Sequence, residues 1–534
     1  MRRFFHRLIR FWPFICAAGA ALGFVALLWR VRDTPLELGA YVRVDAVSAF
    51  FGVAMLSGLA LALALAQSLQ RPFVSRTVCA IALLLLIFST TFTPAIAGGY
   101  MLFAFIARAP NLPAALNLPP LSRAALLALC RRAVSSAPWP LAAACLLIGY
   151  GTLAFRGALF YTDPVAGAAL SSFVFWFVLL AALIPLVPFR APDTRPTPEQ
   201  TRSSWFGERA LTIGWCYPLV RLYSLGPWNL GWSFATLLVA GALAGWCTVS
   251  ALAEPNRQHR IARLTASYLG LALAGIGLGT SAGIAGACFC LLAMLVLGAG
   301  VFGDSVGAPP EDFGDPTEQQ HRDSSELAHS RSFIAWLLAG VFPFTAPFVG
   351  IWMLIGASIA AGVPLLAGVA WLVGLLNGLT ITLWGMARPI GRRFAIALAA
   401  LSVALGVGAP LIVRVLIQPV VAQLQGGLTP YGDIAIWPWV GLAANDAAHI
   451  QVTTLPSIAI AVLMLVLAAL VYLVVRLRDT YAVVQPSPPG EHTMPASTPR
   501  LRDELLRNLR DDVPWLGLLI GNEVQPEESP RERE

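Results

Sequence analysis

The sequence contains no lysine, and its 36 basic residues are all arginine. Because arginine stays protonated at physiological pH, no lysine is available to exchange a proton. Charge of either sign is scarce: 12% of the 534 residues are charged, whereas soluble domains carry about 25%. Since 57% of the residues are hydrophobic, the composition excludes a soluble domain and predicts an all-α, polytopic membrane protein. The formal net charge of +8 needs no nucleic-acid partner to account for it, and the expected surroundings are a lipid bilayer.

Motifs that bind cofactors or metals are also missing. The eight cysteines are scattered, mostly in apolar runs, and none forms a CxxC pair. Cys288 and Cys290 are separated by one residue, which is more typical of packing than of a metal or redox centre. The histidines are dispersed, and no phosphate-binding loop, dinucleotide-binding glycine motif, haem-attachment site or iron–sulfur spacing occurs. We therefore expect no cofactor, no metal site and no catalytic residue.

Long apolar runs are abundant. A spanning helix needs about 20 apolar residues. The run after MRRFFHRLIR has no small-residue cleavage site, so we expect a retained helix and not a signal peptide. Pro343 and Pro347 interrupt another run and predict a helix broken at membrane depth. The predicted spans are 11–29, 46–66, 77–93, 95–107, 137–155, 166–188, 211–225, 231–253, 264–281, 283–302, 333–361, 364–386, 394–417 and 456–475.

The arginines between these runs indicate a topology. Cytoplasmic loops of membrane proteins carry an excess of basic residues. If the N-terminus lies inside, most loop arginines fall on the inner side, and Arg30, Arg32, Arg43 and Arg156 remain outside. The scheme closes with both termini inside. It predicts an even number of spans in a prokaryotic inner membrane.

Within the predicted spans, charge is almost absent. Only Arg221 and Arg414 occur there, with no Asp, Glu or His. An ion-translocating protein needs a membrane side chain whose pKa can be crossed, and arginine holds its proton far above physiological pH. The preferred interpretation places both arginines near helix ends, from where they snorkel to an interface. The alternative is a functional role inside the membrane.

Several diverged segments follow the order of motifs in one known family. They are YVRVDAVSAFF (41–51), IPLVPFRAPDTRPTP (184–198), LTIGWCYPLVRL (211–222), NRQHRIARLTASYLGLALAGIGLGTSAGIAGACFC (256–290) and FPFTAPFVGIWMLI (342–355). The segments resemble those of antiporter-like membrane subunits, which occur in proton-pumping NADH:quinone oxidoreductase (complex I), membrane-bound hydrogenases and multisubunit cation/proton antiporters. The resemblance implies about 14 transmembrane helices, with two inverted five-helix repeats that each contain a broken helix.

The same resemblance locates the family's proton path, and its ionisable positions are apolar in this sequence. The family's membrane glutamate corresponds to Ile106, and the lysine before the first break corresponds to Leu183. The partner lysine in the next helix corresponds to Ile213, and the lysine or glutamate after the second break corresponds to Ile351. We therefore expect that the breaks persist for packing while the charges that carry protons are lost.

The resemblance also suggests how the chain is divided and what it does. The expected regions are N-terminal transmembrane helices (1–107), a first repeat region (108–302), an acidic loop (303–332), a second repeat region with the final helices (333–476), and a Pro-rich linker with an amphipathic tail (477–534). The expected function is an antiporter-like membrane-arm subunit of a complex I-like or hydrogenase-like respiratory assembly, structural and not proton-pumping, with other membrane subunits as partners. Two alternatives remain: a proton or cation translocator that uses substitute polar residues and water, and a small-molecule carrier.

Overall fold

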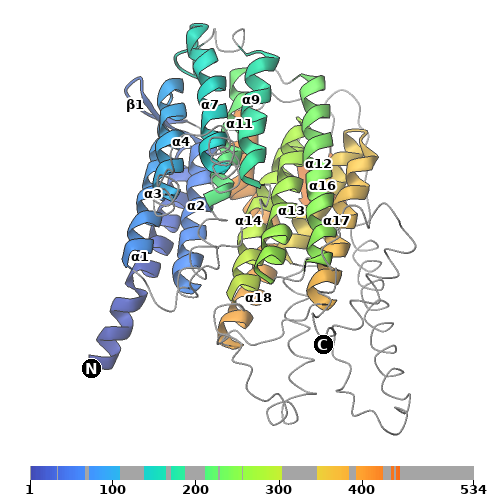
Figure 1. Ribbon diagram of the computed structural model, residues 1–534. Coiled ribbons are helices and arrows are strands. Elements are labelled where there is room, and N and C mark those ends of the chain that lie inside the picture. The colour runs from blue at the N-terminus through green and yellow to red at the C-terminus, as the bar shows by residue number, and fades with distance from the viewer. Residues whose placement is uncertain are drawn as a thin grey trace, which may run out of the picture.

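The computed structural model describes residues 2–32, 34–65, 71–108, 138–163, 170–186, 211–226, 229–254, 257–303, 345–383, 392–424, 434–437 and 441–444. Figure 1 shows helices that run roughly side by side, with α1 to α4 at one flank and α12, α16 and α17 at the other. Pro343, the acidic loop beyond residue 303, the predicted span 456–475 and the tail 477–534 lie outside the described residues. The predictions made for them stay predictions.

Helices occupy the predicted apolar runs wherever the structure describes them. The first flank contains α1 (Arg2–Arg30), α2 (Ala46–Leu65), α3 (Arg71–Ser89) and α4 (Thr93–Arg108). The middle contains α7 (Pro138–Phe155), α9 (Ser172–Leu183), η2 (Ile184–Leu186), η3 (Ile213–Cys216) and α11 (Tyr217–Leu225). The rest contains α12 (Leu230–Ala253), α13 (Arg257–Gly277), α14 (Ser281–Gly303), α16 (Ala346–Ala360), α17 (Pro364–Leu383), α18 (Arg392–Val407), α19 (Ala409–Ile412), η4 (Val413–Ile417) and α20 (Gln418–Leu424).

The strands in the described ranges form two short hairpins. Strands β1 (Leu36–Leu38) and β2 (Val42–Val44) pair antiparallel, with Leu36 opposite Val44. Their turn contains Gly39 at φ 74°, a left-handed conformation that glycine adopts without strain. Strands β3 (Ile434–Trp437) and β4 (Gly441–Ala444) also pair antiparallel. The first hairpin matters for function because β2 leads directly into α2.

The described ranges contain four unbent helices that are long and apolar enough to cross a membrane, or five spans if one bent pair is included. The four are Ala46–Leu63, Pro138–Phe155, Leu230–Ala253 and Ser281–Gly298. Within the bundle, 94% of the Ser281–Gly298 stretch is buried, compared with 39% of Leu230–Ala253. Helix α14 therefore lies in the interior, against α13, α16, α18 and α2, while α12 lies at the periphery.

The predicted span 394–417 contains a feature that the sequence did not reveal, because the helix bends by 69° at Gly408. Pro410 lies in the first turn of α19, and its ring nitrogen cannot donate to a carbonyl in the preceding turn. The chain then passes through the π-helical turn η4 and continues as α20. This bend turns α20 back against the start of α2.

Proline lies at a described helix end beside each of the two predicted breaks, and residues 187–210 and 304–344 lie outside the described ranges. Helix α9 ends in a tight 3-10 turn that contains Pro185, and α11 is preceded by the 3-10 turn η3 and carries Pro218 in its first turn. In the second half, α16 starts at Ala346, with Pro347 in its first turn and Thr345 extended at its N-cap. Proline is tolerated there because the first amides of a helix have no intrahelical acceptor.

Glycines allow α13, α14 and α16 to approach closely. A methyl group added at Gly275 would lie 2.5 Å from Cδ2 of Leu354 on α16 and 2.8 Å from the carbonyl oxygen of Gly283 on α14. One added at Gly350 would lie 2.9 Å from Sγ of Cys290. Small residues at helix crossings let the backbones come close together. In a membrane, the hydrophobic effect does not drive helices together, so these van der Waals contacts stabilise the packing.

We expect Gly275→Val to destabilise the bundle by about 1–3 kcal/mol or more, because the new side chain overlaps a backbone oxygen that cannot move aside. Gly368→Ala on α17 is the matched control, since nothing lies within 4 Å of its added methyl group. Unfolding of the purified protein in mixed micelles of dodecyl maltoside and sodium dodecyl sulfate would measure both variants. Equal stability of the two would contradict the close packing of the three helices.

Candidate functional site

A buried ion pair joins α11 to the residue before α2. Nη1 of Arg221 lies 2.7 Å from Oδ2 of Asp45, and Nη2 of Arg221 donates to Oδ1 at 2.8 Å. Both side chains are 1% exposed. The Nη2 contact is a charge-assisted hydrogen bond, and Nη1 adds a close charge–charge contact that lacks hydrogen-bond geometry. The preferred interpretation of the sequence expected Arg221 to snorkel to an interface. The structure differs, because its side chain is buried in an ion pair.

Local structure places the two charges. Asp45 is the cap of α2, because its Oδ1 accepts the backbone amide of Ser48 at 2.9 Å and its carbonyl accepts the amide of Ala49. Tyr217 and Arg221 are four residues apart, so they share one face of α11. Nε of Arg221 donates to the Tyr217 hydroxyl at 2.9 Å. Hydrogen bonds within its own helix thus orient each of the two charged side chains.

Groups from three other segments complete the site. The carbonyl of Phe88, in the last turn of α3, accepts the Tyr217 hydroxyl at 2.9 Å and lies 2.6 Å from Oγ of Ser48. The ring of Tyr161 lies 4.4 Å from the guanidinium carbon, at cation–π distance. From α20, Nε2 of Gln423 donates to Oδ2 of Asp45 at 2.5 Å. We call Asp45, Ser48, Tyr217, Arg221 and Gln423 the ion-pair cluster.

The cluster keeps Asp45 ionised. Burial alone raises the pKa of this carboxyl, but the charge of Arg221 and the hydrogen bonds from Arg221 and Ser48 outweigh it. The net pKa therefore lies below its ordinary value. A carboxylate held in this way does not take up a proton near neutral pH. The geometry suits a fixed cross-link between helices and not a group that binds and releases protons in turn.

The four positions that the resemblance assigns to the family's proton carriers lie outside the set of residues that forms the ion-pair cluster. Leu183 and Ile213 are 7% and 0% exposed, and Ile351 is 2% exposed. Ile106 is half-buried and packs against the core. They come from α9, η3, α16 and α4, and Ile213 lies one turn before Tyr217, because η3 leads directly into α11.

Aromatic rings fill the space beside two of these positions. Phe103 lies one turn before Ile106 on α4 and stacks on Trp139 of α7, with ring centroids 5.4 Å apart. Trp215 of η3 lies 5.8 Å from Phe103 and 5.0 Å from Tyr100. These ring–ring contacts are apolar, and the indole nitrogen of Trp215 has no hydrogen-bond partner among the described residues.

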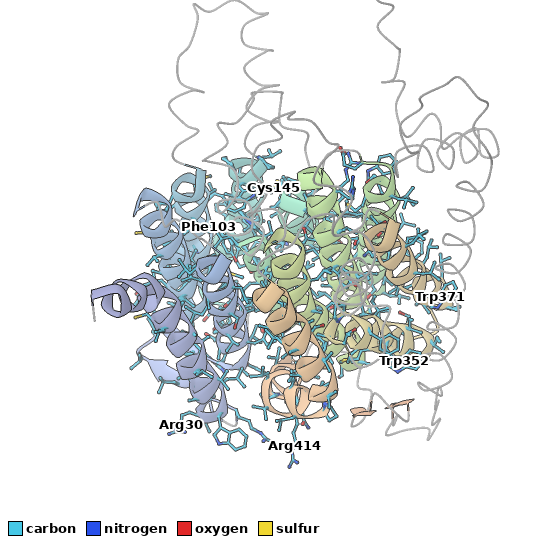
Figure 2. All side chains as sticks on the ribbon, turned by 90° about the horizontal axis from the view of Figure 1, so that it is seen from below. Arg30, Phe103, Cys145, Trp352, Trp371 and Arg414 are labelled. Atoms are coloured by element: carbon cyan, nitrogen blue, oxygen red, sulfur yellow. The ribbon has the colours of Figure 1, made fainter. Side chains whose placement is uncertain are left out.

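Arg414 lies on the surface. It belongs to the π-helical turn η4 and is exposed, and Figure 2 shows its side chain pointing away from the bundle. The structure thus separates the two membrane arginines that the sequence treats alike. One is buried in an ion pair, and the other faces the surroundings.

Sequence reasoning missed Asp45 and Gln423. Asp45 stands one residue outside the apolar run that begins at Ala46, so a count of charge within spans overlooks it. The signal was present in YVRVDAVSAFF, where an acidic residue precedes the run and a serine follows three positions later. Gln423 had no signal in the sequence, because its contact with Asp45 spans 378 residues. Among the described residues, no group of three or more His, Cys, Asp or Glu side chains could hold a metal ion.

Comparison of the fold with solved structures finds membrane complexes. A chain of the Mrp complex from Dietzia sp. matches with a TM-score of 0.60 and 16% identity, over 95% of this chain and 58% of that one. A chain of respiratory complex I from Thermus thermophilus with bound NADH matches at 0.56 and 17%, over 78% and 98%. A chain of the archaeal membrane-bound sulfane sulfur reductase matches at 0.58 and 16%, over 95% and 91%. The chain shares its fold with these three chains of membrane complexes.

Sequence comparison points the same way. NADH-quinone oxidoreductase subunit N of Salinibacter ruber is 29% identical over 238 residues, which are 42% of this chain and 45% of that protein. Subunit N 1 of Acidiphilium cryptum is 27% identical over 235 residues, 42% and 48% of the two chains. The chain thus spans about half the length of the curated relatives it matches, and no family model matches it. Relatives and structural neighbours together support the antiporter-like membrane subunit family.

Proposed function

We propose that this chain is a membrane-arm subunit of a complex I-like, hydrogenase-like or Mrp-like assembly, and that its role is structural and not proton-pumping. The antiporter-like fold and the subunit N relatives support the first part. Other membrane subunits are then its partners, as they are for the chains it resembles. Lipid covers the remaining surface, and no nucleic acid takes part.

The structural role is inferred from the side chains at the positions that the resemblance assigns to the family's proton carriers. Leu183, Ile213 and Ile351 are buried apolar side chains. Arg221, a charge buried in α11, is neutralised by Asp45. A proton relay needs groups that gain and lose protons in turn. Neither the apolar side chains nor a locked ion pair supplies them.

The finer architecture is part of the same proposal. We propose about 14 transmembrane helices in two inverted five-helix repeats, with both termini in the cytoplasm of a prokaryotic cell. The five regions proposed from the sequence, from 1–107 to the tail 477–534, fit this arrangement. The breaks beside Pro185 and Pro347 support it, because inverted repeats of this kind each contain one discontinuous helix.

A translocator that uses substitute groups is the competing function. The ion-pair cluster contains hydroxyl groups on Ser48 and Tyr217 beside a charge, which is the kind of environment that could order water. Here both hydroxyls are directly bonded to protein groups, while Nη1 of Arg221 and the hydroxyl of Tyr161 beside it have no hydrogen-bond partner among the described residues. The two functions differ in whether the isolated chain moves protons.

We expect the purified chain, reconstituted in liposomes under an imposed pH gradient, to dissipate the gradient no faster than protein-free vesicles. The physical reason is that an unpaired charge in the apolar interior costs several kcal/mol. A pH-sensitive dye trapped in the vesicles would report the flux, and gramicidin would serve as the positive control. Proton flux through the wild-type chain that is lost in Tyr217→Phe, with the fold of that variant confirmed by its unfolding curve, would establish the substitute translocator instead.

A further inference from the structure

A proline interrupts the helical hydrogen bonds where η3 passes into α11. Pro218 lies in the first turn of α11 and has no backbone N–H. In an uninterrupted helix that N–H would donate to the carbonyl of Gly214, four residues earlier. The amide of Tyr217 donates to this carbonyl instead, in the tighter 3-10 geometry. One lone pair of the Gly214 oxygen is therefore left for a donor from outside the segment. We call residues 213–218 the η3–α11 joint.

A tyrosine of another helix supplies that donor. The hydroxyl of Tyr100, on α4, donates to the Gly214 carbonyl at 2.6 Å. Tyr100 is 0% exposed, and its ring centroid lies 5.0 Å from that of Trp215. Because the Tyr217 amide and the Tyr100 hydroxyl both donate to the Gly214 carbonyl, its two lone pairs are used. Some broken membrane helices coordinate cations with such freed carbonyls, but this carbonyl has no lone pair left for a cation.

Three further tyrosine hydroxyls fix the same part of the chain to its neighbours, each by donating to a backbone carbonyl. The donor and acceptor pairs are Tyr150 with Pro218 at 3.2 Å, Tyr217 with Phe88 at 2.9 Å, and Tyr223 with Ile276. Phe88 and Ile276 lie in the last turns of α3 and α13, where carbonyls have no amide partner within the helix. Tyrosine hydroxyls thus join η3 and α11 to four other helices, α3, α4, α7 and α13.

We infer that the η3–α11 joint is fixed and does not act as a hinge, because the Tyr100 hydroxyl takes the place of the amide hydrogen that Pro218 lacks. A hinge needs a few residues whose backbone dihedral angles change during the motion. A change at Gly214 would separate its carbonyl from a buried hydroxyl on another helix, and a buried polar group left unpaired is costly. The inference deepens the proposed structural role, since a fixed joint neither binds an ion nor moves with one.

Hydrogen–deuterium exchange of the full chain in dodecyl maltoside, followed by mass spectrometry, tests this inference. Tyr100→Phe keeps the ring and removes the hydroxyl. We expect the amides of residues 213–225 to exchange about 5- to 10-fold faster in this variant, because one buried hydrogen bond is lost. Tyr41→Phe is the control, since Tyr41 is 60% exposed and lies outside the joint. Equal exchange of residues 213–225 in the two variants would overturn the inference.

A second substitution separates the hydrogen bond from packing of the Tyr100 ring. Pro218→Ala restores a backbone N–H that can donate to the Gly214 carbonyl. In this background, Tyr100→Phe should no longer accelerate exchange, because the carbonyl keeps a second donor. The same acceleration in both backgrounds would show that Tyr100 does not substitute for the missing amide hydrogen, and would overturn the inference.

A measurement on the wild-type chain needs no variant to fold. Replacing choline chloride by sodium chloride should leave the exchange of residues 213–225 unchanged. Slower exchange in sodium chloride alone would show a cation at the joint and would overturn the inference. Exchange reports the joint, whereas the pH-gradient measurement reports proton flux. A mobile joint in a chain without flux would therefore contradict this inference and leave the proposed function standing.

Discussion

Arg221→Leu is expected to lower the free energy of unfolding by about 3–5 kcal/mol, because it leaves the Asp45 carboxylate buried without its counter-charge. Asp45 is 1% exposed, and Gln423 and Ser48 would be its remaining side-chain partners. Neither carries a charge. Unfolding of the purified protein in mixed micelles, followed by circular dichroism, would measure the loss.

Two controls make this result specific. Arg414→Leu removes the same side chain from an exposed position, so its effect should stay within about 0.5 kcal/mol. The double variant Asp45→Asn with Arg221→Leu should recover part of the loss, since an asparagine can still cap α2 and no charge is then buried. If Arg221→Leu and Arg414→Leu were equally stable, the ion pair would not hold the fold. If the double variant were worse than the sum of its parts, the stabilisation would come from something other than charge pairing.

Ile213→Lys places the family's ionisable group back at its corresponding position, and we expect it to destabilise the chain by several kcal/mol. Ile213 is 0% exposed, and an unpaired ion of this size has an effective burial penalty of several kcal/mol. The same unfolding measurement applies, together with the yield of monodisperse protein.

Ile213→Met is the matched control, because it keeps the volume and the apolar character and should cost less than about 1.5 kcal/mol. A lysine tolerated as well as the methionine would mean that water reaches this position. That outcome would argue against the structural role and in favour of translocation. The comparison at one site thus tests the function through stability, independently of any flux measurement.

Helix positions could be predicted from the sequence because apolar runs of spanning length are a strong and local signal. The runs at 46–66, 137–155 and 231–253 match α2, α7 and α12 to within a residue or two. The bend at Gly408 was missed, since Gly408 and Pro410 interrupt the helix without interrupting its hydrophobicity. Hydrophobicity reports how deep a segment lies. It does not report direction, and the 69° turn changes only direction.

The candidate site was harder to predict for a different reason. Tyr217 and Arg221 share a face of one helix, so their proximity follows from sequence spacing. The partners of Arg221 are set by packing between helices that are far apart in the chain, and no local pattern encodes that packing. The sequence therefore suggests an interface around Arg221, whereas Asp45, Tyr161 and Tyr217 enclose it. The family resemblance contained the clue, because the segment at 41–51 includes Asp45.

The pairing of Asp45 with Arg221 has a consequence for how the chain is made. Asp45 leaves the ribosome 176 residues before Arg221. At a synthesis rate of about 5–20 residues per second, roughly 9–35 seconds pass before Arg221, its counter-charge, is made. During that interval the start of α2 must stay at the hydrated membrane surface or be sheltered by the insertion machinery. Gln423 arrives later still, so biogenesis of the N-terminal helices is completed only when the C-terminal half has been synthesised.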